Sequence, residues 1–144
     1  MTALFVASAL SLACPRVSSG VRRPALTVGD ARVSVADGAR QLHLQMTVRN
    51  PNRIALTARA LDWRVELDRN PPIRGRSPLD SAIPAGGQTT IEVVLPALAP
   101  AQDQVKPTSY GDYRFVGMVH FSSPRGDVAG QFDVAGPLYP EGQK

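Results

Sequence analysis

The sequence predicts an all-β protein, an antiparallel β-sandwich of about seven strands. Apolar and polar residues alternate over several short segments, which is the pattern of strands with one face in a core and the other in water. Thirteen Pro and twelve Gly punctuate the 144 residues, and this favours short strands joined by turns over long helices. Because alternation on a single face dominates, we expect two sheets packed face to face.

The first two strands form a predicted hairpin. Residues 26–36 begin the domain, and Asp37-Gly38 follows them as a dipeptide typical of a tight turn. The second strand, residues 41–49, has the clearest alternation in the chain. Its core-facing positions are predicted to be Leu42, Leu44, Met46 and Val48.

A turn at Asn50-Pro51-Asn52 ends the second strand. Pro51 presets the φ angle that the second position of a turn needs, and Asn side chains can hydrogen-bond their own backbone. An extended segment begins at Ile54, and residues 61–67 alternate again. Trp63, the only tryptophan, is predicted to anchor the core between two sheets rather than to stack on a ligand.

The next segments are less regular. Residues 73–77 are polar and predict an edge strand or a loop, and Ile83 is a lone apolar residue before a Pro/Gly turn. Residues 90–95 alternate and predict a strand. Residues 97–109 are rich in Ala, Pro and Gln and predict a loop with at most one helical turn.

Two further strands complete the predicted domain, which spans residues 26–140. Residues 113–122 are apolar on both faces, which predicts a strand in the middle of a sheet. A turn at residues 123–126 leads into the last strand, and residues 141–144 form a tail. The apolar residues of the last strand are Val128, Phe132 and Val134.

The charge is unevenly distributed. The formal net charge is +4, and fourteen of the sixteen basic residues are Arg. Residues 40–76 hold eight Arg against three acidic residues, whereas residues 77–144 hold four basic and seven acidic residues. A basic surface can bind nucleic acid or an anionic membrane, but no Lys/Arg cluster interleaved with aromatic residues accompanies this charge. We therefore expect these Arg on the solvent faces of strands, and no nucleic acid as a partner.

The sequence contains no recognisable catalytic constellation. His43 and His120 fall on predicted strands without a His-x-His pair or paired carboxylates beside them, and His43 is expected to face solvent. There is no Gly-x-Ser-x-Gly motif, and Gly86-Gly87 lacks the Lys and Ser/Thr of a phosphate-binding loop. We therefore predict no catalytic residue, no metal ligand and no cofactor, and hence a protein that is not an enzyme.

Three carboxylates line one face of a predicted strand and the turn after it, at Asp62, Glu66 and Asp68. A weak cation site is one interpretation of this face. Pairing of these carboxylates with Arg64 and Arg69 is the favoured one.

The first fourteen residues resemble a lipoprotein signal peptide. Residues 1–13 are uncharged and largely apolar, and as a helix they would span about 20 Å, too short to cross a bilayer. Ser11-Leu12-Ala13-Cys14 resembles a lipobox, in which the cysteine is lipidated and becomes the mature N-terminus. Cys14 would then carry the lipid, and residues 15–25 would be a polar tether. A plain cleaved signal and a buried apolar N-terminal strand or helix are the alternatives.

Six segments form an ordered set of motifs. They are Val-Arg-Asn-Pro-Asn at 48–52, Leu-Asp-Trp-Arg-Val-Glu-Leu at 61–67, Ile-Pro-Ala-Gly-Gly at 83–87, the strand at 90–95, the strand at 113–121 and the turn at 124–126. Together they resemble the WHy domain of the late embryogenesis abundant (LEA) type 2 family, over about residues 28–138. The resemblance implies an immunoglobulin-like or fibronectin-III-like sandwich, an association with water stress and desiccation, and no catalytic, metal or cofactor site.

Bacterial members of that family often carry lipoprotein-type leaders, which agrees with the interpretation of Cys14. We therefore expect a non-catalytic protein, anchored by lipid in the bacterial cell envelope and facing the periplasm or the exterior. Its expected role is to protect against desiccation stress by binding partners, which include the membrane surface and envelope proteins. The alternative is a structural or assembly component of the envelope that recruits a partner chain along exposed strand edges. An enzyme acting on envelope material is disfavoured.

Overall fold

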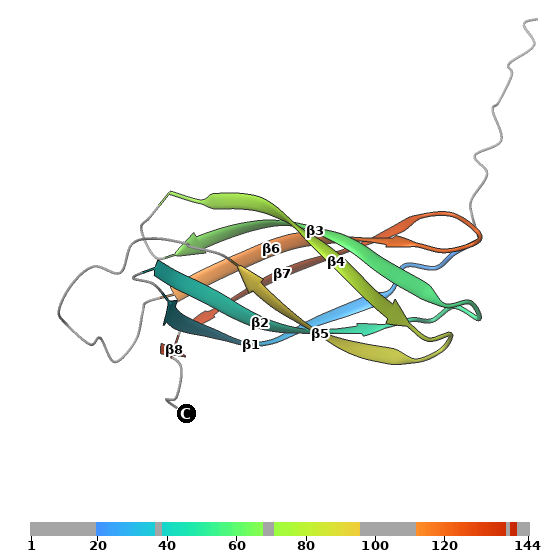
Figure 1. Ribbon diagram of the computed structural model, residues 1–144, viewed down its shortest axis with the longest axis horizontal. Helices are drawn as coiled ribbons and strands as arrows, with labels where there is room; N and C mark the ends of the chain where they lie inside the picture. Colours follow the sequence, from blue (N-terminus) through green and yellow to red (C-terminus); the bar gives the residue numbers. More distant parts are fainter. Residues whose placement is uncertain (1–19, 37–38, 68–70, 96–111, 138, 141–144) are drawn as a thin grey trace, which may run out of the picture.

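The chain folds into two four-stranded sheets that face each other in a β-sandwich (Figure 1). The computed structural model describes residues 20–36, 39–67, 71–95, 112–137 and 139–140. Every regular element within these ranges is a strand, and none of them contains a helix long and apolar enough to cross a bilayer. The predicted all-β sandwich is therefore confirmed.

One sheet has the strand order β5-β2-β1-β8. Neighbouring strands in it run antiparallel, except that the short β8 pairs parallel with β1. The predicted hairpin between the first two strands is confirmed, because Ala36 pairs with Ala39; its turn lies outside the described residues. The four strands are β1 (Ala25–Ala36), β2 (Ala39–Arg49), β5 (Gln88–Leu95) and β8 (Tyr139–Pro140).

The other sheet has the order β4-β3-β6-β7 and is antiparallel throughout. The strand that is apolar on both faces, β6, lies between β3 and β7, as its sequence predicted. A strand in this position has neighbours on both edges and half-buried side chains on its outer face, which explains its apolar character. The four strands are β3 (Leu56–Leu67), β4 (Ile73–Ile83), β6 (Asp112–Ser122) and β7 (Val128–Pro137).

The prediction for β4 was wrong in one respect. Residues 73–77 and Ile83 were expected as separate pieces, but they belong to one strand of 11 residues. Exposed and partly buried positions alternate along all of it, although only Ile83 is fully buried. Because β4 lies at the edge of its sheet, weak apolar alternation is sufficient, and Pro78 is tolerated beside a register shift in β3 between Ala58 and Ala60.

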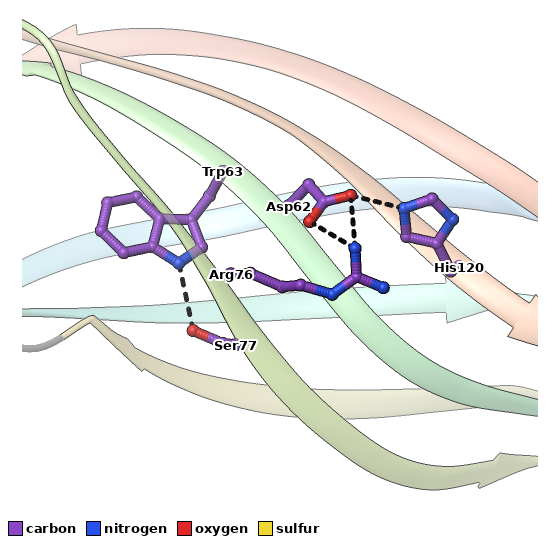
Figure 2. A network of polar contacts seen from close by, with 5 residues as sticks. All are labelled: Asp62, Trp63, Arg76, Ser77 and His120. Carbon is purple, nitrogen blue, oxygen red and sulfur yellow. Dashed lines mark hydrogen bonds and ion pairs between the residues drawn. The ribbon is translucent and has the colours of Figure 1, made fainter.

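The core lies between the sheets and contains the predicted apolar faces of β2 and β3. Trp63 is 7% exposed and packs in this core, so its predicted role as an anchor is confirmed. Its indole N–H donates a hydrogen bond of 3.1 Å to the Ser77 hydroxyl on β4 (Figure 2). Gly75 lies opposite Trp63 on β4, and glycine is required there because a Cβ would lie 2.3 Å from the tryptophan ring.

Two asparagine side chains are buried at one end of the sandwich, in residues 50–52, which we call the asparagine corner. Asn50 is 1% exposed, and its Oδ1 accepts hydrogen bonds of 2.9 Å from both the backbone and the side-chain amide of Asn52. Its Nδ2 donates to the carbonyl oxygens of Ile54 and Pro84, at 2.8 and 3.2 Å. Asn52 in turn bonds both backbone polar groups of Arg22, at 2.7 and 2.8 Å.

Backbone hydrogen bonds join the same corner to the turn before β5. The Asn50 N–H donates to the Gly87 carbonyl, and the Gly86 N–H donates to the Asn52 carbonyl, both at 2.8 Å. Gly86 has a φ of 65°, a left-handed conformation that favours glycine. The asparagine corner therefore connects three segments: the chain before β1, the β2–β3 connection and the β4–β5 turn. The sequence had predicted only its local turn.

The two ends of the described chain lie at opposite ends of the sandwich (Figure 1). Gly20 lies beside the asparagine corner, where it shares a pocket with Asn52. At the far end Pro140 pairs with Val33 in β1.

Candidate binding surface on the outer face of one sheet

The outer face of the β4-β3-β6-β7 sheet carries the main cluster of polar side chains among the described residues. Strand periodicity places them there: Leu61, Trp63 and Val65 of β3 point into the core, so Asp62 and Arg64 between them point outward. Antiparallel pairing then brings β4 and β6 to either side of β3. We call this surface, defined by Asp62, Arg64, Glu66, Arg76, Arg114, Val116, Met118, His120, Gln131 and Asp133, the outer charged face.

Asp62 is the centre of this face (Figure 2). It lies opposite Arg76 on β4, and the Arg76 Nη1 donates to both of its carboxylate oxygens at 3.1 and 3.3 Å. On its other side the His120 Nε2 lies 2.6 Å from Asp62 Oδ2. One carboxylate thus joins three strands through side chains that remain partly exposed.

Two further ion pairs flank this centre. Arg64 pairs with Glu66 on the same strand, and Arg114 on β6 forms two hydrogen bonds with Asp133 on β7, at 3.0 and 2.7 Å. The hydrogen bonds from the Arg114 guanidinium hold the pKa of the Asp133 carboxyl below its usual value, and the same bonds raise the pKa of Arg114.

A shallow depression of about 580 Å³ lies between these groups. Val116 and Met118 give it an apolar, half-buried floor, while Asp62, Arg64 and Asp133 contribute charged walls. The Nε of Arg64 is buried there and has no hydrogen-bond partner among the described residues. A surface with an apolar centre and a charged margin fits a partner that presents apolar and charged groups together.

The closeness of His120 and Asp62 raises the question of a metal site in the described part of the chain. No group of three or more His, Cys, Asp or Glu residues there is placed to hold a metal ion. His120 and Asp62 approach each other, but they supply two ligands, and Arg76 occupies the remaining side of the carboxylate.

The predicted pairing of Asp62, Glu66 and Asp68 with Arg64 and Arg69 is confirmed in part. Arg64 pairs with Glu66, whereas Asp62 pairs with Arg76 and His120. Asp62 and Arg76 meet because they lie directly opposite each other in the antiparallel pair of β3 and β4, where side chains on the same face come close together. No paired carboxylates were expected beside His120, and a single carboxylate, that of Asp62, lies against it.

His43 lies on the outer face of the other sheet, as predicted, but its side chain is only 29% exposed. Its Nε2 lies 2.7 Å from the Ser34 hydroxyl, and its Nδ1 lies 3.7 Å from Glu92 on β5. The expectation of a simple solvent-facing histidine is therefore incomplete, because both neighbouring strands supply it with a polar partner.

Other predictions fall outside the described residues. Among them are the leader with its lipidation residue Cys14, most of the tether, the loop at 97–109, and Asp68 with Arg69. The expected exposure of the basic residues in 40–76 is confirmed for five described arginines, whereas Arg64 is partly buried. The five exposed ones are Arg49, Arg53, Arg59, Arg74 and Arg76.

Comparison with solved structures identifies the fold. The chain resembles the solution structure of a protein described as late embryogenesis abundant (LEA), with a TM-score of 0.66 and 17% identity over 86% of this chain and 75% of that chain. A solution structure from Arabidopsis thaliana matches with a TM-score of 0.59 and 13% identity, over 85% of this chain and 86% of that one. A crystal structure from Archaeoglobus fulgidus matches with a TM-score of 0.55 and 11% identity, over 83% and 96%.

The chain therefore has an LEA-like sandwich fold. The sequence itself matches no protein-family model and no curated protein. At these sequence identities the likeness shows a shared fold. It gives no basis for assigning a role to any individual residue of the outer charged face.

Proposed function

We propose that this protein is a non-catalytic member of the LEA type 2 class, with a WHy-type domain, that protects partners against water loss. The single observation that carries the proposal is the likeness of its sandwich to the solved LEA structure over 86% of the chain. The order of the six sequence motifs supports the same class independently of the coordinates.

We propose further that Cys14 is acylated and holds the domain at a membrane surface of the bacterial envelope. The apolar residues 1–13 and the lipobox-like Ser11-Leu12-Ala13-Cys14 support this part. Growth with a fatty-acid analogue should label the wild-type chain and leave Cys14→Ser unlabelled and released from the membrane fraction. If both chains fractionate alike and keep Met1, the anchor is wrong.

The outer charged face is the proposed contact with partners. Its charges are paired in the free protein and remain partly exposed, so they can exchange partners at little cost. The apolar floor at Val116 and Met118 supplies area that a partner can cover.

Protection is measured by drying a labile enzyme with the purified protein and assaying the activity that remains. We expect wild-type protein to preserve activity and Arg76→Glu/Arg114→Glu to lose most of that effect, because both changes reverse charge on the outer charged face. The matched control is Arg32→Glu/Arg49→Glu, which makes the same charge change on exposed positions of the other sheet. Equal protection by all three proteins would remove the face from the proposal.

The same proteins test the role in cells. A deletion strain should survive drying or osmotic shock less well, and wild type and the Arg32→Glu/Arg49→Glu control should restore survival, while the outer-face variant should not. Unchanged survival of the deletion strain, together with no protection in vitro, would contradict the stress role itself.

A structural role in envelope assembly is the second candidate. The observation that favours it is the length of the edge strands: β4 has 11 residues and β5 has eight, and each pairs on only one side within the described structure. Cross-linking in intact envelopes separates the two roles. A single stoichiometric partner linked through β4 or β5 would favour assembly over general protection.

A further inference from the structure

Three arginine side chains gather at the end of the sandwich where the described chain begins. Arg22 comes from the segment before β1, Arg53 follows the asparagine corner, and Arg125 lies in the turn between β6 and β7. All three are exposed, and all three line one polar pocket of about 320 Å³. The three residues are far apart along the chain, so no local sequence pattern indicates that they meet.

The charge around this pocket is one-sided. No carboxylate lines it, and none of its three guanidinium groups has an ion pair with a described residue. The arginines of the outer charged face differ, since each of them has a carboxylate partner. Asp127 follows Arg125 closely in the sequence but lines a different hollow, beside β3 and β6. Like charges held together without a counter-charge repel, so an anion in the pocket lowers the free energy of this arrangement.

The base of the pocket is held in place without a ligand. Buried Asn52 bonds the backbone N–H and C=O of Arg22, and Arg53 follows it directly in the chain. In the β6–β7 turn the Ser123 hydroxyl donates to the Gly126 carbonyl at 2.7 Å and accepts from the Arg125 N–H at 3.2 Å. Only the arginine side chains remain to be ordered when a ligand binds, which reduces the entropic cost of binding.

We propose that this pocket binds a phosphate-type oxyanion. Guanidinium groups present planar pairs of N–H donors that match two oxygens of a phosphate, and three of them can surround one such group. The anion has two sources of the same chemistry, free phosphate and a phospholipid headgroup. The second source alone rests on the proposed anchor: Cys14 lies six residues before Gly20, and six extended residues reach about 20 Å, which keeps the pocket near the headgroups.

The test compares three full-length proteins by calorimetric titration with inorganic phosphate. They are the wild type, the pocket variant Arg53→Gln/Arg125→Gln and the control Arg32→Gln/Arg74→Gln, which removes two exposed arginines outside the pocket. We expect the pocket variant to bind phosphate about tenfold more weakly or worse, and the control to stay within about twofold of wild type. Since all the substituted side chains are exposed, thermal melting should show that both variants fold. If the two variants lose the same affinity, or wild type does not prefer phosphate to chloride, the proposal is wrong.

Vesicle binding distinguishes the sources, with phosphatidylcholine vesicles that contain either phosphatidylglycerol or oleate as the anionic lipid. Preference for phosphatidylglycerol that disappears in the pocket variant assigns the site to a headgroup. Phosphate binding without that preference assigns it to a free anion, and both results support the site. Equal binding to both anionic vesicles without phosphate binding reduces the pocket to general surface charge. All three proteins carry the same leader, so the comparison of their phosphate binding does not depend on acylation. If Cys14 proves not to be acylated, the proposed anchor is wrong but the result for the pocket stands.

Discussion

The asparagine corner and the outer charged face are both polar, yet they differ in how their polar groups meet water. At the corner, Asn50 and Asn52 are 1% and 8% exposed, and neutral amides bond backbone groups from three segments. On the outer charged face, full charges meet in pairs whose side chains are about one third to two thirds exposed. The comparison teaches that burial, and not formal charge, decides how strongly a polar group holds the fold.

The largest expected effect is that of Asn50→Ala. It removes an acceptor of two hydrogen bonds and a donor to three carbonyl oxygens, and it leaves buried backbone groups without partners. Because each unsatisfied buried group costs about 1–3 kcal/mol, we expect the free energy of unfolding to fall by about 3 kcal/mol. Denaturant unfolding measures it. The control is Pro51→Ala at the exposed position of the same turn, expected to cost less than about 1 kcal/mol; equal losses would contradict the role of the corner.

The second effect comes from beneath the outer charged face. A Cβ on Gly117 would lie 2.3 Å from the ring of Phe132, which packs on Phe115 with ring centroids 4.8 Å apart. Gly117→Ala must therefore displace an aromatic ring in the core, and we expect it to cost about 1–3 kcal/mol of stability. Gly136→Ala is the matched control on β7, because its nearest contact would be an ordinary 3.6 Å to Tyr113. If Gly117→Ala leaves the free energy of unfolding unchanged, the core beneath this face can repack around the added methyl group and the prediction is wrong.

A smaller effect is expected for Asp62→Ala, although it removes the centre of the face and two of its contacts. The partners Arg76 and His120 remain partly exposed and regain water, so we expect a loss of less than about 1 kcal/mol. The measurement is the same denaturant titration. A loss as large as that of Asn50→Ala would erase the distinction between the two regions.

The smallest effect is the pH dependence of the Arg114–Asp133 pair. The pKa of Asp133 is below its ordinary value in the folded chain, so the pair contributes to stability above the unfolded pKa of about 3.9 and loses this contribution as the pH falls through the folded pKa. A carboxyl NMR titration of Asp133 should give a lowered pKa in wild type and an ordinary one in Arg114→Gln. The same pKa in both proteins would exclude the pair as the cause.

The sequence was sufficient for the layers of the fold and for most of its core. The alternate apolar residues of β2 are all buried as predicted, because a local period of two can be recognised without knowing the partner strand. They are Leu42, Leu44, Met46 and Val48. The burial of Trp63 was predicted from the same alternation of apolar and polar residues. The edge strand β4 was divided wrongly, since an edge position tolerates polar residues that would exclude a central strand.

The polar contacts were not predictable in the same way. The contact between His120 and Asp62 depends on the register of β3 against β6, two strands 58 residues apart at this point. Both side chains alternate with buried residues of their own strands, so the sequence could have placed Asp62 and His120 on the same outer face once β3 and β6 were assumed to pair. At the asparagine corner the local turn was predicted, but its contacts with Arg22 and Pro84 were not, because these residues lie in other segments.

The parallel pairing of β8 with β1 has a mechanical consequence. The described chain enters β1 at the end near the asparagine corner and leaves through β8 at the far end, so tension between these two points acts along the strands and in opposite directions on the pair. Hydrogen bonds loaded in this way must shear together, whereas bonds at the mouth of a hairpin open one after another. The antiparallel ladder from β1 to β2 lies alongside and shares the load. A domain pulled from its ends should therefore resist unfolding through β1 and its two neighbours.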